Sequence, residues 1–146
     1  MGLNIYTYPI ETAKIGGTTY IPITFDGVLG GSVDRKLFIR NDDLTLWFSD
    51  IQVQAYEDGT TLNVVTGPAW EIRLLEKDIA PSTEEWLAAA AGNQITLTSD
   101  IGTADRGDTS TYLSFWIRVT VPRDQEAQNI TSVVLRIEAT ANLVGE

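Results

Sequence analysis

Hydrophobic residues recur at every second position through much of this chain. In residues 111–121 they alternate with polar or aromatic residues, and this period of two is typical of a half-buried β-strand. Pro122 ends the strand because proline has no N–H to donate to a neighbouring strand. The alternation returns at about residues 132–141, so the polar stretch 123–129 between the two predicts the loop of a hairpin.

Shorter segments of the same kind precede these two strands. Their apolar residues share one face within residues 21–25, 37–39, 47–56, 70–74 and 95–97. Pairs and triplets rich in glycine, asparagine and aspartate separate most of them, as turns do. Seven or eight short strands with such punctuation predict an all-β fold, an antiparallel β-sandwich. The length and the lack of a linker or repeat predict a single domain over residues 1–146.

One segment breaks the two-residue period. Ser82 stands three residues before Glu85, which is the spacing of a capping box at the start of a helix. The apolar and alanine-rich run that follows predicts one short α-helix over about residues 82–91. Because a helix of this length is marginal alone, we expect Trp86 or Leu87 to dock on the sandwich.

Strand parity divides the aromatic residues between two faces. Trp47, Trp70 and Phe115 fall inward and are expected in the core. Five others fall on the opposite, otherwise polar faces: Phe38, Phe48, Tyr56, Tyr112 and Trp116. Five outward aromatics on neighbouring strands indicate a second buried surface, covered by the helix, by a sugar or by another protein. A β-bulge would reverse the faces assigned beyond it.

The charge balance narrows the classes of partner. Twenty acidic and ten basic residues give a net charge of −10, which repels phosphate backbones and anionic lipid head groups. We therefore expect no nucleic acid and no membrane as partner. The chain has no histidine and no cysteine, so it lacks the usual zinc ligands and the Ser-His-Asp and Cys-His relays. We expect neither a metal nor a cofactor.

Carboxylates are the main groups left for chemistry. Glycosidases work with two of them, but twenty acidic residues produce chance pairs. Asp42 and Asp43 follow Asn41 and are better explained as a turn. Three aspartates share a later loop without the alternating pattern of a calcium-binding EF-hand: Asp100, Asp105 and Asp108. We expect these side chains to be solvated, and the protein to be no enzyme.

Two further features have simple interpretations. Arg106-Gly107-Asp108 spells the tripeptide that integrins recognise, but it stands among turn-forming residues and is predicted to be a turn. The first residues lack the charged and apolar regions of a signal peptide. We expect the protein to act without export through a membrane, and residues 1–10 to form an extended N-terminal arm.

Two stretches carry a resemblance to a known class of proteins. They are residues 26–56, "DGVLGGSVDRKLFIRNDDLTLWFSDIQVQAY", and residues 113–143, "LSFWIRVTVPRDQEAQNITSVVLRIEATANL". Together with residues 67–92, "GPAWEIRLLEKDIAPSTEEWLAAAAG", they look like uncharacterised virion structural proteins of tailed bacteriophages. The segments "WIRVTVP" and "VVLRIEA" also resemble the last two strands of immunoglobulin-like domains.

The resemblance implies a noncatalytic β-sandwich present in many copies on a virion that assembles in the bacterial host cytoplasm. The first expectation is a capsid decoration or cement subunit, a homo-oligomer that contacts the major capsid protein, or else tail proteins, through the outward aromatics and the arm of residues 1–10. A tail or baseplate structural protein is equally compatible with it. A carbohydrate-binding module is an alternative from another class, with sugar stacked on Trp116, Tyr112 and Tyr56. A carboxylate-based hydrolase is a third.

Overall fold

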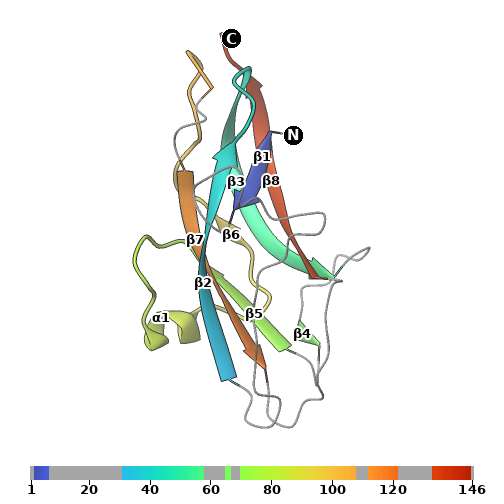
Figure 1. The fold of residues 1–146 in the computed structure, drawn as a ribbon, viewed down its shortest axis with the longest axis vertical. Coiled ribbons are helices and arrows are strands. Elements are labelled where there is room, and N and C mark those ends of the chain that lie inside the picture. The colour runs from blue at the N-terminus through green and yellow to red at the C-terminus, as the bar shows by residue number, and fades with distance from the viewer. Residues whose placement is uncertain are drawn as a thin grey trace.

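The computed structural model describes residues 2–6, 31–57, 65–66, 70–107, 112–121 and 133–145. These residues form two antiparallel sheets that enclose one hydrophobic core, with a single short helix beside them (Figure 1). The predicted fold class, an all-β sandwich with one short helix, is confirmed. The strand expected at residues 21–25 lies outside the described residues.

The larger sheet has five strands in the order β1-β2-β7-β5-β4. Their bounds are β1 Leu3–Tyr6, β2 Gly31–Asn41, β7 Tyr112–Val121, β5 Trp70–Leu75 and β4 Val65–Thr66. β2 and β7 pair without interruption from Gly31 opposite Val121 to Arg40 opposite Tyr112. This central pair holds the strictest alternation of the sequence, because one face of each strand is in the core and the other is not.

The smaller sheet has three strands in the order β6-β3-β8. Their bounds are β6 Ile95–Thr96, β3 Leu46–Glu57 and β8 Val133–Leu143. The hairpin predicted between the last two long strands is therefore wrong. β7 lies between β2 and β5, while β8 pairs with β3 in the other sheet. Both strands show the same two-residue period, and a period does not reveal which strand is the neighbour.

The core fills the space between the two sheets. Its most completely buried members are Leu37, Ile39, Phe48, Ile51, Val53, Ala55, Ile72, Leu74, Ile101 and Phe115. Phe115 is inside as predicted, whereas the side chain of Trp70 lies outside the described part.

A β-bulge in β3 reverses the faces expected for two aromatic residues. Ser49 pairs with Thr140 and Gln52 with Glu138, so two residues of β3 oppose one residue of β8. Asp50, within the bulge, has a left-handed backbone with φ of 52°. Because of the extra residue, the positions of β3 that face the core are odd-numbered after the bulge and even-numbered before it. Phe48 is consequently 0% exposed in the core, and Trp47 is half-buried on the other face. The two predicted positions are exchanged.

The helix α1, Thr83–Ala88, begins as the capping box predicts and ends three residues early. The Ser82 hydroxyl accepts from the Glu85 N–H at 3.2 Å, and the Glu85 carboxylate accepts from the Ser82 N–H at 3.0 Å. After Ala88 the backbone becomes extended, and the Arg73 Nε donates to the carbonyl of Ala89 at 3.0 Å. A hydrogen bond to β5 thus replaces the last predicted turn.

Part of the predicted N-terminal arm belongs to the larger sheet. β1 pairs with β2 in register, from Leu3 opposite Asn41 to Tyr6 opposite Phe38. Leu3, Ile5 and Tyr6 are buried. A strand of four residues is too short to give a period in the sequence. Residues 7–10 lie outside the described part of the chain.

Candidate functional site

The register of β2 and β7 brings three of the five predicted interface residues onto one surface. Lys36 lies opposite Trp116, Phe38 opposite Ser114, and Arg40 opposite Tyr112. The residues between them face the core, so these six share the outer face of the larger sheet. All six are half-buried. We call Phe38, Tyr112 and Trp116 the aromatic band.

Ring and cation contacts organise this band. The rings of Phe38 and Tyr112 meet edge to face, with 6.5 Å between their centroids and an interplanar angle of 84°. The Lys36 Nζ lies 5.6 Å from the Phe38 centroid, and the Arg40 Cζ lies 5.8 Å from that of Tyr112. Both arrangements are attractive. The two cations were missed as site residues, although the period of two places Lys36 and Arg40 on the face of Phe38.

The other two predicted interface residues are elsewhere. Phe48 is in the core and contributes nothing to a surface, because of the bulge in β3. Tyr56 belongs to the smaller sheet, where its backbone pairs with Val134; its side chain lies outside the described residues. The sequence thus assigned one interface to residues of two different sheets.

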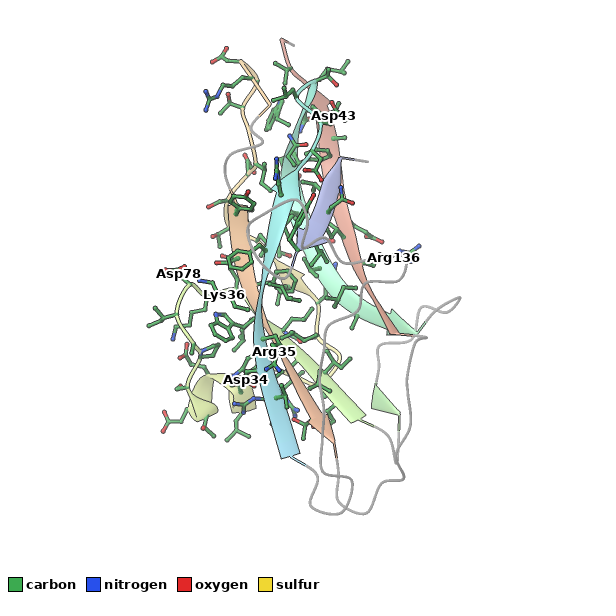
Figure 2. The ribbon with its side chains drawn as sticks, viewed as in Figure 1. Asp34, Arg35, Lys36, Asp43, Asp78 and Arg136 are labelled. Atoms are coloured by element: carbon green, nitrogen blue, oxygen red, sulfur yellow. The ribbon has the colours of Figure 1, made fainter. Side chains whose placement is uncertain are left out.

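Five ion pairs balance the charge on and around this outer face. They are Lys36–Asp78 at 3.0 Å, Arg40–Asp42 at 3.1 Å, Arg73–Glu71 at 2.6 Å, Arg118–Asp34 at 2.7 Å, and Lys77–Glu85. Figure 2 shows Asp34, Lys36 and Asp78 on the same side of the molecule. The other five basic and fifteen acidic residues of the chain account for the whole net charge of −10. Among the described residues, each cation of the aromatic face, Lys36 and Arg40, is therefore matched by a carboxylate.

The helix covers only one part of this face. Trp86 is 1% exposed, and the Arg118 Cζ lies 5.1 Å from the centroid of its ring. The expected docking of the helix is therefore made by Trp86, while Leu87 is 75% exposed. Phe38 and Tyr112 lie further along β2 and β7, four and six register pairs from Arg118. The helix explains the burial at Arg118, and within the described part of the chain no helix contact to Phe38 or Tyr112 is recorded.

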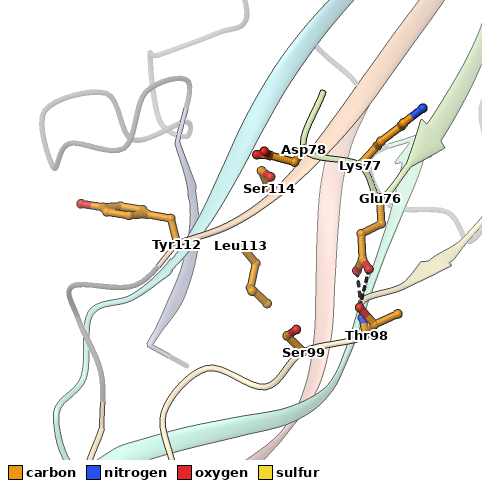
Figure 3. Close-up of a pocket in the computed structure, with 8 residues that line it drawn as sticks. All are labelled: Glu76, Lys77, Asp78, Thr98, Ser99, Tyr112, Leu113 and Ser114. Atoms are coloured by element: carbon orange, nitrogen blue, oxygen red, sulfur yellow. Dashed lines mark hydrogen bonds between the residues drawn. The ribbon is translucent and has the colours of Figure 1, made fainter. Parts of the chain in front are cut away.

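A shallow depression of about 270 Å³ adjoins Tyr112 where β5 ends. Its lining residues are Glu76, Lys77, Asp78, Thr98, Ser99, Tyr112, Leu113 and Ser114. The Glu76 carboxylate accepts from the Thr98 N–H at 2.8 Å and from its hydroxyl at 2.6 Å (Figure 3). Asp78 accepts from Lys36 at 3.0 Å. Both carboxylates already hold protein partners, and the Tyr112 ring extends away from Glu76 and Thr98.

The aspartates after Asn41 form a structural corner, as the turn prediction requires. Asp42 accepts hydrogen bonds from the Tyr6 hydroxyl and, at 2.8 Å, from the Asn4 amide, which fastens β1 to the end of β2. Asp43 accepts from the hydroxyl and the N–H of Thr45. These two bonds, the hydroxyl first, lower the pKa of Asp43 below its ordinary value.

The remaining sequence motifs have structural explanations where the structure describes them. Within the described ranges, no three acidic side chains converge as metal ligands, and Asp100 and Asp105 are exposed. Gly107 is buried, and a Cβ there would lie 2.6 Å from the Leu44 carbonyl oxygen. Close packing therefore accounts for the glycine of the Arg-Gly-Asp triplet. Asp108 lies outside the described residues.

Neither the search for membrane-spanning helices nor the comparison with known proteins adds to the description of the site. Among the described residues, no helix has the length and apolar character to cross a membrane. A comparison of the chain with protein-family models, with curated proteins and with solved structures finds no significant match.

Proposed function

We propose that this protein is a noncatalytic structural subunit of a tailed-bacteriophage virion, in the first place a capsid decoration or cement subunit. The observation that carries the proposal is the aromatic band with its paired cations on the outer face of the larger sheet. The phage-like stretches of the sequence supply the assignment to a virion. A tail or baseplate position fits the same observation.

The composition of the band favours a protein partner. Aromatic residues and arginine are enriched in protein interfaces and dominate their binding energy. Phe38, Tyr112 and Arg40 supply both types within one contiguous surface. The ion pairs neutralise the carboxylates that they join on this face, which lowers the local repulsion of other acidic subunits. Such a surface suits a subunit that is packed against a neighbour in an assembly.

A carbohydrate-binding module is the second candidate, favoured by the depression beside Tyr112 with its hydroxyl and carboxylate groups. Sugar stacking requires an open ring face. Arg40 lies over the ring of Tyr112, and Lys36 over that of Phe38, which favours a protein contact instead. Binding of the purified chain to a glycan array, abolished by Tyr112→Ala, would support the sugar candidate. An array without hits would remove it.

Virions from a phage genome that encodes this chain provide the direct test. We expect the double variant Phe38→Ala with Tyr112→Ala to lower the number of copies per particle and the survival of particles after heat or osmotic shock. The matched control is Leu44→Ala, which truncates a side chain that is 64% exposed and outside the band. Circular dichroism of the purified variants checks that the fold persists.

Two results would contradict the proposal at different levels. Particles that lack the protein but resist heat and osmotic shock equally well would remove the cementing role. Absence of the protein from purified virions would remove the structural role altogether. Deletion of residues 1–10 is a poor test, because Leu3–Tyr6 form β1 and fill part of the core.

A further inference from the structure

The two sheets, as far as the structure describes the chain, have four edges, and one of them is long. Among the described residues, the edge strands are β1, β4, β6 and β8. The first three have four, two and two residues, whereas β8 has eleven. Short edges offer little to pair with, but a long edge presents a row of N–H and C=O groups that suits another strand.

The inward face of β8 is incompletely covered. Leu135, Ile137 and Ala139 pack on the core but are only half-buried. The residues of β3 that pair with them are fully buried. Val53, opposite Ile137, is 0% exposed, and Ala55, opposite Leu135, is 1% exposed. The apolar row therefore continues to the edge of the sheet and loses cover there. A further strand beside β8 would extend that cover.

The outward face of β8 has a self-complementary charge pattern. Arg136 and Glu138 are both exposed and flank Ile137, and Arg136 extends from the side of the molecule away from Asp34 and Lys36 (Figure 2). In an antiparallel pair of two β8 strands centred on Ile137, Arg136 of each copy lies opposite Glu138 of the other. Opposite charges at directly facing positions stabilise a strand pair.

Alternative registers are penalised by the same residues. A shift by one residue turns the apolar row of one copy toward the solvent face of the other. A shift of two residues in one direction places Arg136 opposite Arg136, and in the other direction Glu138 opposite Glu138. Like charges at facing positions are destabilising. Charge and burial together therefore select the register centred on Ile137.

We propose that β8 is a self-association edge, at which two copies of the chain pair antiparallel about a twofold axis at Ile137. The two three-stranded sheets then become one six-stranded sheet. Leu135 of one copy lies opposite Ala139 of the other on the core side, and two Arg136–Glu138 pairs close the outer side. This inference goes beyond the proposed function and does not rest on it, because β8 and the aromatic band belong to different sheets.

Charge reversal tests the register in the full chain. We expect sedimentation velocity to show a dimer for the natural sequence. Arg136→Glu or Glu138→Arg alone should raise the dissociation constant of the dimer roughly tenfold or more, because each variant creates two facing like-charge pairs. An equimolar mixture of these two variants should form a heterodimer, since every facing pair is then opposite in charge. Glu84→Arg, on the exposed face of α1, is the matched control and should leave the dimer intact.

A cysteine scan gives a second readout, because the chain has no cysteine of its own. Ile137→Cys places the two introduced thiols at facing positions on the twofold axis, within the Cα separation that a disulfide needs. Thr140→Cys is the control, because its facing residue is Val134 of the second copy. We expect the first variant, and not the second, to form a disulfide-linked dimer under mild oxidation.

Three results would overturn the proposal. They are a natural chain that stays monomeric at every concentration tested, a dimer that survives the single charge reversals, and a mixture of the two reversals that forms no heterodimer. In a monomer, β8 amides protected from hydrogen exchange on both edges would show that the chain covers this edge itself. None of these results removes the protein from a virion, so they remain distinct from a failure of the proposed function.

Discussion

Trp86 is the residue that fastens the helix to the sheet. Its side chain is 1% exposed against the face that holds Arg118, whereas Leu87 beside it is 75% exposed. We expect Trp86→Ala to lower the free energy of unfolding by about 3–5 kcal/mol, as for other buried aromatic truncations. Leu87→Ala should change it by less than about 0.5 kcal/mol. Urea denaturation measures both, and equal effects would contradict docking through Trp86.

Two carboxylates make the fold sensitive to acid. The Thr45 hydroxyl and N–H lower the pKa of Asp43, and Lys77, followed by the Ser82 N–H, lowers that of Glu85. Because their pKa values are lower in the folded state than in the unfolded state, their stabilisation is complete above the unfolded values of about 4. It is lost as the pH falls through the folded values.

The measurement is the free energy of unfolding against pH. We expect a decline below pH of about 4, and a shallower decline for Asp43→Asn, which no longer ionises there. Asp100→Asn is the control, since Asp100 is an exposed carboxylate in a different loop. The decline of the free energy of unfolding at acid pH is assigned in part to Asp43. A decline that Asp43→Asn leaves unchanged and Asp100→Asn alters would contradict this.

At the scale of elements, the bulge in β3 is the feature that most changes the surface. It puts Asp50 at φ of 52°, where side chains other than glycine and, to a lesser degree, asparagine and aspartate are strained. We expect Asp50→Gly to leave stability unchanged or raise it by up to about 1 kcal/mol. Asp50→Val should lower it by about 1–2 kcal/mol.

Thermal denaturation compares these variants with Thr140→Gly. Thr140 is an exposed residue of β8 near the bulge, and glycine at an ordinary strand position should destabilise by about 0.5–1 kcal/mol. A loss of stability in Asp50→Gly as large as that in Thr140→Gly would contradict a bulge at this position.

The bulge also shows which features of the fold the sequence alone does not predict. Phe38, Tyr112 and Trp116 were placed correctly on the outer face because β2 and β7 pair without interruption. Phe48 was misplaced because a bulge depends on how β3 pairs with β8, and strand pairing leaves no local signal. For the same reason the sequence joined β7 and β8 into a hairpin, although their alternation was recognised. The capping box of α1 needed only residues 82 to 85 and was predicted correctly.

At the scale of the whole molecule, two surfaces differ from the acidic remainder. One is the aromatic band on the larger sheet, where ion pairs balance the charge. The other is β8, the long edge of the smaller sheet. The two surfaces belong to different sheets, so a dimer formed through β8 keeps both aromatic bands available. A subunit with these two contacts can bind a neighbour of its own kind and a different partner at once.

The number of copies of this protein in purified virions tests the proposed role most directly. Quantitative mass spectrometry of gradient-purified particles, with the major capsid protein as the internal standard, measures that number. A structural subunit predicts a constant copy number that matches the symmetry of the particle and falls in the Phe38→Ala, Tyr112→Ala double variant. Virions that contain none of the protein would contradict it.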